Sequence, residues 1–188
     1  DFHPIIVTVP IDLRGRFGSH TLRNFFSNVN VTVTPGPNLS FDDLLKDVSN
    51  QLNEGKKPEV VNQKINDNVS AQKNMMIRFV PLGIKNMVMR HIYHEADKGV
   101  TTTLSNLGRV VLPESLAPYV EEIRMMIPVT PHQPIRGGVI SCNDRFVLSF
   151  TSSLEETDIQ RYFFRFLKKY GIDITISCNE EFNHEILF

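Results

Sequence analysis

Residues 137–172, GGVISCNDRFVLSFTSSLEETDIQRYFFRFLKKYGI, decide the fold class because they contain both kinds of regular element. The first half predicts two strands, joined by a tight hairpin turn at Asn143 and Asp144. The second half predicts a helix, because Ser153 and Glu156 form an S-x-x-E capping box before an apolar stripe that ends at Gly171. A strand pair followed by an amphipathic helix indicates a sheet with helices packed on it.

Further strands are predicted on both sides of this stretch. Some segments are β-branched apolar runs, and others alternate polar and apolar residues with a period of two. Pro10 places a strand end or a sheet edge within the first of them, because proline cannot donate to a ladder. The predicted strands cover residues 5–13, 28–34, 100–104, 121–129 and 172–177.

Helices are predicted between these strands. Ser40 begins an S-x-x-D capping box, so a helix follows it and ends by Gly55. A second helix covers residues 58–72, and a third carries its apolar face at Ile84, Met87, Val88 and Ile92. The expected fold is a single domain over residues 1–188, an α/β (α+β) two-layer sandwich with a mixed sheet and helices packed on it.

Composition excludes several classes of partner. The formal net charge is −1, which gives no field that would attract nucleic acid or an anionic membrane surface. No apolar run approaches the ~20 residues of a membrane span. The two cysteines, Cys142 and Cys178, lie far apart in apolar segments and are expected to be buried free thiols. With no recognisable signal peptide, these features predict a cytoplasmic protein without nucleic-acid or membrane partners.

Residues 90–99, RHIYHEADKG, place two histidines, a glutamate and an aspartate close together. The order H-x-x-H-E at His91 and His94 matches neither H-E-x-x-H nor H-x-x-E-H, so no metal site is predicted. The sequence D-K-G favours an ordinary helix end, with Gly99 in a left-handed cap. A supporting role for these histidines in a substrate site remains the alternative.

Four segments follow one another along the chain: VPIDLRGRFGSHTLRNFFSNVNV (9–31), SFDDLLKDVSNQL (40–52), TTTLSNLGRVVLPE (101–114) and the 137–172 stretch. Together they resemble the C-terminal half of the chloramphenicol acetyltransferase-like superfamily, in its branch of alcohol acetyltransferases and condensation domains. Residues 9–31 are similar to the family's V-P-V-x-L-R strand and the run that follows, and residues 101–114 are similar to its S-N-x-G strand. The other two are an amphipathic helix and a segment that resembles the family's paired strands with their closing helix.

The resemblance implies one lobe of a coenzyme A-dependent acyltransferase fold, in which two similar lobes enclose a tunnel. Acyl-CoA, with acetyl-CoA as one candidate co-substrate, enters from one side and a small alcohol acceptor from the other; no permanently bound cofactor is implied. The family's general base lies in an H-H-x-x-x-D-G motif of the N-terminal lobe, and this sequence lacks that motif. The chain is therefore expected to be a C-terminal lobe whose catalytic N-terminal lobe lies outside it, and to be inactive alone. The family's D-F-G-W-G motif is also absent.

The resemblance implies that hydroxyl and amide groups of the S-N-x-G strand support the oxyanion, which gives Thr103, Ser105 and Asn106 as candidates. Thr101, His94 and Arg14 are candidates for substrate contact. In a regular strand, alternation places Thr101, Thr103 and Ser105 on one face. The alternatives are that these hydroxyls satisfy backbone groups, and that Arg14 is a buried structural ion-pair partner.

Two further expectations concern the strand and the surface. Gly108 is expected to permit a turn after the strand. An isolated lobe would expose the apolar surface that its partner covers, so self-association is expected. The competing function is a non-catalytic, condensation-like binding or scaffold module that holds a partner through a sheet edge.

Overall fold

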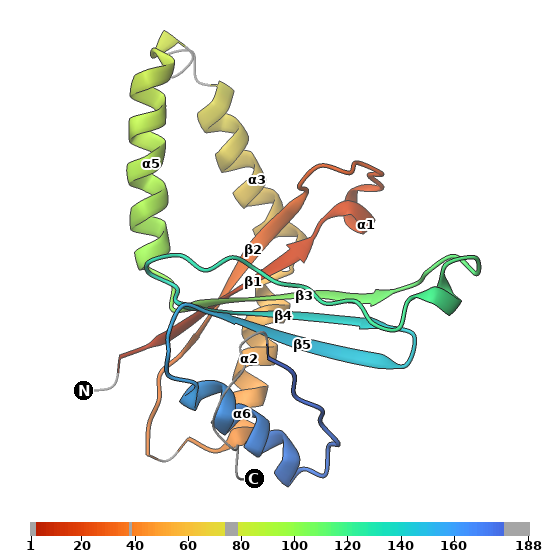
Figure 1. Ribbon diagram of the computed structural model, residues 1–188. Helices are drawn as coiled ribbons and strands as arrows, with labels where there is room; N and C mark the ends of the chain where they lie inside the picture. The colour runs from red at the N-terminus through yellow and green to blue at the C-terminus, as the bar shows by residue number, and fades with distance from the viewer. Residues whose placement is uncertain (1–2, 38, 74–78, 179–188) are drawn as a thin grey trace. The chain divides into compact units, whose positions relative to one another are not determined.

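The chain is an α+β protein built on a five-stranded mixed sheet, as the computed structural model in Figure 1 shows. The structure describes residues 3–37, 39–73 and 79–178. The chain divides between Ser153 and Leu154 into two units. The first unit contains the whole sheet, and the second contains one helix. The predicted mixed sheet with helices is confirmed.

The strand order is β2-β1-β3-β4-β5. The two outer pairs, β1 with β2 and β4 with β5, are antiparallel, whereas β3 runs parallel to both of its neighbours. The turn between β4 and β5 contains Asn143 with a φ of 52°, a left-handed conformation that asparagine tolerates, which confirms the predicted hairpin. The strands are β1 Ile5–Asp12, β2 Phe26–Val33, β3 Thr102–Val110, β4 Ile135–Cys142 and β5 Arg145–Ser152.

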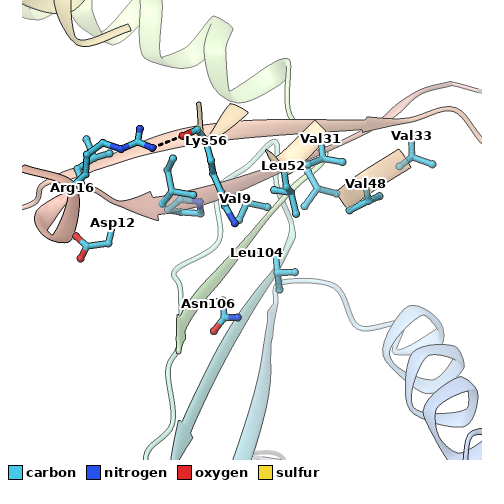
Figure 2. A pocket seen from close by; sticks show the side chains of 14 residues that line it. Val9, Asp12, Arg16, Val31, Val33, Val48, Leu52, Lys56, Leu104 and Asn106 are labelled. Atoms are coloured by element: carbon cyan, nitrogen blue, oxygen red, sulfur yellow. Dashed lines mark hydrogen bonds between the residues drawn. The ribbon is translucent and has the colours of Figure 1, made fainter. Parts of the chain in front are cut away.

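The sheet is joined at its centre by a very short parallel contact. β1 and β3 are in register only at Val7 with Thr102 and Thr8 with Thr103, while β1 pairs with β2 along its whole length. Pro10 lies just beyond that contact, in the part of β1 that pairs with β2 alone. A proline has no N–H to donate to a second neighbour. The β1–β2 hairpin therefore diverges from β3, β4 and β5, and the sheet opens into a fork (Figures 1 and 2).

The first unit also contains helices. Ser40 caps α2 as predicted, because its Oγ accepts the backbone N–H of Asp43 at 3.1 Å. α2 packs on β2, and Val61 of α3 is completely buried. The first unit contains α1 Arg14–Phe17, α2 Phe41–Gly55, α3 Pro58–Lys73, α5 Leu82–Lys98 and the 3-10 turn η1 Ala117–Tyr119; the second contains α6 Asp158–Lys169.

Side chains of α2 and α3 reach the open edge of β2. The amide of Gln51 accepts from the backbone N–H of Thr32 at 2.9 Å and donates to its carbonyl oxygen at 2.8 Å. The ammonium of Lys64 donates to the carbonyl oxygen of Asn28 at 2.9 Å. Backbone groups of an edge strand are thereby paired with side chains instead of a further strand.

The helix α5 touches the rest of the first unit through its last turn. Only Asp97 of this helix is buried, Lys85 is half-buried, and all its other residues are exposed. The apolar face predicted from Ile84, Met87 and Val88 is present but uncovered. No helix in the part of the chain that the structure describes is long and apolar enough to cross a bilayer.

Two predicted strands are absent. Residues 121–129 form no strand, and the Pro128 carbonyl oxygen accepts a hydrogen bond from Arg136 at 2.9 Å. The segment lies against β4 at Gly138, where an added Cβ would lie 2.6 Å from the carbonyl oxygen of Met125. Residues 172–178 are also irregular.

Four local predictions are corrected. Ser153 does not cap a helix. It directly follows β5, where its backbone N–H donates to the Pro134 carbonyl oxygen. The helix α6 begins only after Thr157, whose side chain makes no capping hydrogen bond. Gly99 has a φ of −75°, so it is not a left-handed cap. The strand expected over residues 100–104 begins at Thr102 and runs on to Val110. Cys142 is buried as expected, but Cys178 is exposed.

Candidate functional site

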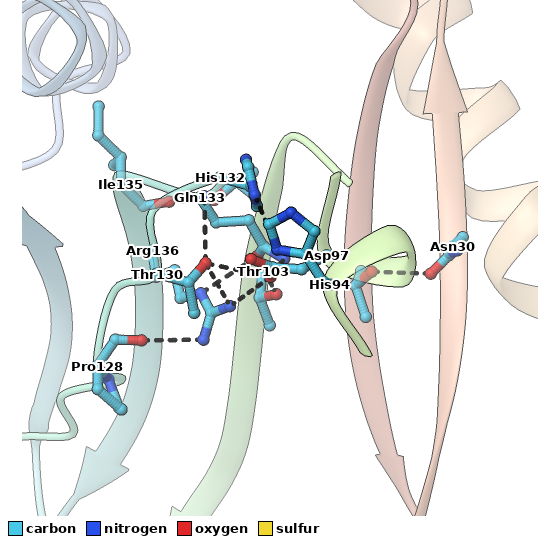
Figure 3. A network of polar contacts seen from close by, with 12 residues as sticks. Asn30, His94, Asp97, Thr103, Pro128, Thr130, His132, Gln133, Ile135 and Arg136 are labelled. Carbon is cyan, nitrogen blue, oxygen red and sulfur yellow. Dashed lines mark hydrogen bonds and ion pairs between the residues drawn. The ribbon is translucent and has the colours of Figure 1, made fainter. Parts of the chain in front are cut away.

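Five polar side chains meet where the last turn of α5 reaches β3 and β4 (Figure 3). We call this group the polar cluster: Asp97, Thr103, Thr130, Gln133 and Arg136. The Thr103 hydroxyl donates to Gln133 Oε1 at 2.7 Å, and Gln133 Nε2 donates to Asp97 Oδ1 at 2.8 Å. Thr130 also donates to Asp97 Oδ1, at 3.1 Å. One amide therefore links a strand hydroxyl to a buried carboxylate.

Gln133 is the centre of this group and is only 4% exposed. Gln133 lies in a tight turn closed by an isolated β-bridge. The backbone N–H of Thr130 donates to the Gln133 carbonyl oxygen and that of Gln133 to the Thr130 carbonyl oxygen, both at 3.2 Å. Arg136 donates from Nε to Gln133 Oε1 at 3.1 Å and from Nη2 to Asp97 Oδ1 at 3.4 Å. Within the described residues, none of the buried side-chain polar atoms of the cluster lacks a partner.

His94 lies beside the polar cluster and contacts His132. His94 Nδ1 and His132 Nε2 are 3.3 Å apart, and the rings meet edge-on with centroids at 4.7 Å. At this distance the two ring nitrogens can share a hydrogen bond whose direction depends on the tautomers. His91 lies one turn earlier on α5 and is exposed. Among the described residues, no group of three or more His, Cys, Asp or Glu side chains is arranged to hold a metal ion.

The polar cluster forms part of a cleft of about 830 Å³. We call it the polar cleft. Asp97, Thr103, Gln133 and Arg136 line it together with Thr8, Asn30, Gln51, Lys64 and Tyr93. Thr8 donates to the side-chain oxygen of Asn30 at 2.8 Å across the first two strands. The walls of this cleft can exchange hydrogen bonds with a polar ligand.

A second cleft of about 690 Å³ lies in the fork of the sheet (Figure 2). We call it the apolar cleft. Its walls are aliphatic side chains from β1, β2, α2 and β3, among them Val9, Val31, Val33, Val48, Leu52 and Leu104. The polar groups that line it are Asp12, Arg16, Lys56 and Asn106.

Strand β3 contributes to both clefts. Thr103 lines the polar cleft, whereas Leu104 and Asn106 line the apolar cleft, as alternation along a strand requires. The candidate pair Thr103 and Asn106 is therefore not brought to one surface. Ser105 is half-buried and lines neither cleft. Thr101 precedes β3, and its hydroxyl accepts the backbone N–H of Ile6 at 3.0 Å.

Asn106 has a local structural role. Its side-chain oxygen accepts the backbone N–H of Gly108 at 2.8 Å, and Gly108 has a φ of 72°. The register between β3 and β4 shifts between Asn106 and Arg109, which marks a β-bulge. Gly108 thus permits a bulge within β3, and the turn expected after the strand was the wrong interpretation.

The Arg14 side chain stabilises the connection between β1 and β2. Its guanidinium pairs with Asp12 at 2.6 Å and donates to the carbonyl oxygens of Thr21 and Arg23, each at 2.8 Å. The predicted ion pair is present, but the side chain is only partly buried. Two of the predicted site residues, Thr103 and His94, do lie near one another at the polar cluster (Figure 3).

Sequence reasoning missed Asp97, Gln133 and Arg136 as a group. Asp97 was interpreted as part of a helix end, and the segment containing Gln133 and Arg136 has no motif. Asp97 is separated from Gln133 by 36 residues and from Arg136 by 39, so no local spacing pattern connects them. A search of family models, curated proteins and solved structures found no match to this chain.

Proposed function

We propose that the chain is the C-terminal lobe of an acyl-CoA-dependent O-acyltransferase and forms one wall of its donor and acceptor tunnel. The observation that carries the proposal is the place of β3. This strand, which carries the S-N-L-G sequence, lies between two clefts and contributes Thr103 to one and Asn106 to the other. The order of the four segments that resemble the acyltransferase family supports the same assignment.

Thr103 is the residue best placed to support an oxyanion. Its hydroxyl donates to Gln133, and a hydroxyl can rotate to donate to a ligand while Gln133 keeps its bond to Arg136. Asn106 keeps its Nδ2 as a donor on the apolar side, because its oxygen is bound to Gly108. A donor aimed at a developing oxyanion lowers the transition-state barrier by ~3 kcal/mol.

The general base is expected from outside this chain. Among the described residues, no histidine lines either cleft, and the carboxylates that line them are Asp12, Asp67 and Asp97. Asp97 accepts three hydrogen bonds, and Asp12 is paired with Arg14. An N-terminal lobe with H-H-x-x-x-D-G would supply a histidine that removes the proton from the acceptor hydroxyl. The chain alone would then bind substrates without turning them over.

A transacylation assay tests this proposal directly. The polypeptide of the complete reading frame is assayed with acetyl-CoA and a panel of alcohols, with release of free thiol as the readout, beside the 188-residue chain. Activity in the longer polypeptide and none in the chain is the expected result. Thiol release by the 188-residue chain alone, or by neither polypeptide, would contradict the proposal that the general base lies outside this chain.

Two threonine variants test the role of Thr103 in the active polypeptide. Thr103→Val removes the hydroxyl on the polar cleft and is expected to lower kcat about 100-fold. Thr102→Val is the matched control, because that neighbouring hydroxyl donates to the Ile135 carbonyl oxygen at 2.7 Å and lines neither cleft. An equal loss of kcat in the two variants would indicate that the Thr103 hydroxyl has only a structural role.

A non-catalytic binding module is the second candidate, and exposed apolar surface favours it. α5 exposes Met87, Val88 and Ile92, and Asp97 in its last turn is the one buried residue of this helix. Uncovered apolar surface of this kind is typical of a protein interface. A complete reading frame without H-H-x-x-x-D-G, together with silence in the assay, would favour this candidate.

A further inference from the structure

The apolar cleft has two chemically different ends. In Figure 2, Arg16, Asp12 and Lys56 lie towards one end, and Val33 and Val48 lie at the other. Between them the walls are aliphatic and come from β1, β2, α2 and β3. The cleft is thus shaped for a ligand that is apolar along its length and polar at one end.

The polar end carries a net positive charge. Asp12 is already paired with Arg14 at 2.6 Å, so it does not neutralise the other two cations. Arg16 is held there by donating from Nη2 to the Lys56 carbonyl oxygen at 2.5 Å. No carboxylate among the described residues pairs with the Arg16 guanidinium or the Lys56 ammonium. Both cations are therefore available to a ligand.

We propose that the apolar cleft binds a fatty acid, with its carboxylate between Arg16 and Lys56 and its alkyl chain along the hydrophobic wall towards Val48. A neutral alkane or alcohol would leave the two cations without a counter-charge, and a small polar anion would leave the aliphatic walls in water. The complementary charge is what selects a carboxylate-terminated chain. The same cleft contributes Asn106 to the proposed tunnel, but this inference concerns binding by the chain itself and needs no partner lobe.

Chain length is the first test. Octanoate and dodecanoate, each below the concentration at which it forms micelles, are titrated into the 188-residue chain by calorimetry. Each buried methylene strengthens binding by about fourfold, so dodecanoate should bind roughly 200-fold more tightly than octanoate. Equal affinities, or no heat from either ligand, would overturn the proposal. Binding to anionic lipid vesicles but not to monomeric dodecanoate would also overturn it and would indicate a membrane-surface patch.

Charge variants test the carboxylate end. Arg16→Gln and Lys56→Gln should each weaken dodecanoate binding by about tenfold and leave dodecanol binding unchanged. Both residues are exposed, so the substitutions leave the core intact. Lys57→Gln is the matched control, because Lys57 pairs with Glu54 at 2.7 Å and does not line the cleft. Equal losses for Lys56→Gln and Lys57→Gln would mean that general charge, rather than this site, attracts the ligand.

A wedge at the apolar end tests the orientation. Val48→Phe fills the end of the cleft and should weaken dodecanoate at least tenfold while octanoate keeps its affinity, because the shorter chain does not reach that end. Val33→Phe is the equivalent variant from β2, to be used if Val48→Phe does not fold by circular dichroism. Loss of both ligands to the same extent in a folded variant would contradict the proposed orientation.

Discussion

Asp97 and Arg136 form an ion pair that joins the last turn of α5 to β4, with 3.4 Å between Oδ1 and Nη2. The Asp97 side chain is 6% exposed and the Arg136 side chain 12%. Because Gln133 and Thr130 donate to the same carboxylate oxygen, the charge is both paired and solvated by the protein. This pair is one of several contacts that join the last turn of an otherwise exposed helix to the rest of the unit.

Replacing Asp97 should therefore be costly. Asp97→Ala leaves the Arg136 guanidinium buried without its counter-charge, which is expected to lower the free energy of unfolding by about 3–5 kcal/mol. Urea denaturation followed by circular dichroism measures the change. Glu95→Ala is the control on the same helix, because its pair with Lys98 is exposed and should contribute little to stability. A loss below about 1 kcal/mol for Asp97→Ala would show that the pair does not hold the helix.

A glycine on β4 is expected to be intolerant of a methyl group. Gly138→Ala would place its Cβ 2.6 Å from the Met125 carbonyl oxygen, a backbone atom that cannot move alone. The expected loss is about 1–3 kcal/mol in the free energy of unfolding, measured by thermal or urea denaturation. Gly15→Ala meets no atom within 4 Å and should change it far less. If the two variants were equally stable, the segment of residues 121–129 would not lie over β4 at this point.

Glu95, in the last turn of α5, has a lowered pKa. A hydrogen bond from Lys98, followed by the attraction of its positive charge, lowers the pKa of Glu95 below its usual value. A lowered pKa in the folded state means that the pair contributes to stability above the unfolded pKa of Glu95. That contribution is lost as the pH falls through the folded pKa.

NMR titration of the Glu95 carboxyl carbon measures this shift. Lys98→Met should return the pKa towards its usual value because it removes both the donor and the charge. An unchanged titration in Lys98→Met would assign the shift to other groups, of which His91 and His94 are the next contributors.

Exposed apolar side chains on α5 should cause self-association of the chain. Met87 is 67% exposed on this helix, and Met87→Glu is expected to shift sedimentation towards the monomer at high protein concentration. Met126→Glu provides a matched change, because Met126 is equally exposed, at 68%, but lies on the segment between β3 and β4. A wild-type chain that sediments as a monomer at every concentration would contradict the prediction.

Local chemistry predicted much of the fold. The Ser40 cap, the Asn143 turn and the helix that begins at Pro58 each depend on residues a few positions apart, so the sequence displays them directly. The apolar run of residues 121–129 is typical of a strand, but the segment makes contacts with distant residues that no local pattern displays: Pro128 accepts a hydrogen bond from Arg136, and Met125 lies against Gly138. Ser153 also misled, because it belongs to the end of β5.

The candidate site could be predicted only in part. The resemblance gives Thr103 and Asn106 as candidates for one site, whereas in the structure they line different clefts. Both the fork and the polar cluster depend on contacts between distant segments. The two-residue register of β1 with β3 and the bonds of Gln133 leave no repeating pattern in the sequence.

Gln51 has a consequence for how this sheet meets other chains. A side-chain amide presents the same donor and acceptor as a peptide group, and at Thr32 it binds both backbone groups of the edge strand. Gln51 therefore makes at Thr32 the two hydrogen bonds that a neighbouring strand would make, while Lys64 adds a positive charge further along β2. A peptide that extended the sheet here would first have to displace the Gln51 side chain. At Thr32 the edge is thereby closed to the strand addition that begins amyloid-like aggregation, unless Gln51 is displaced.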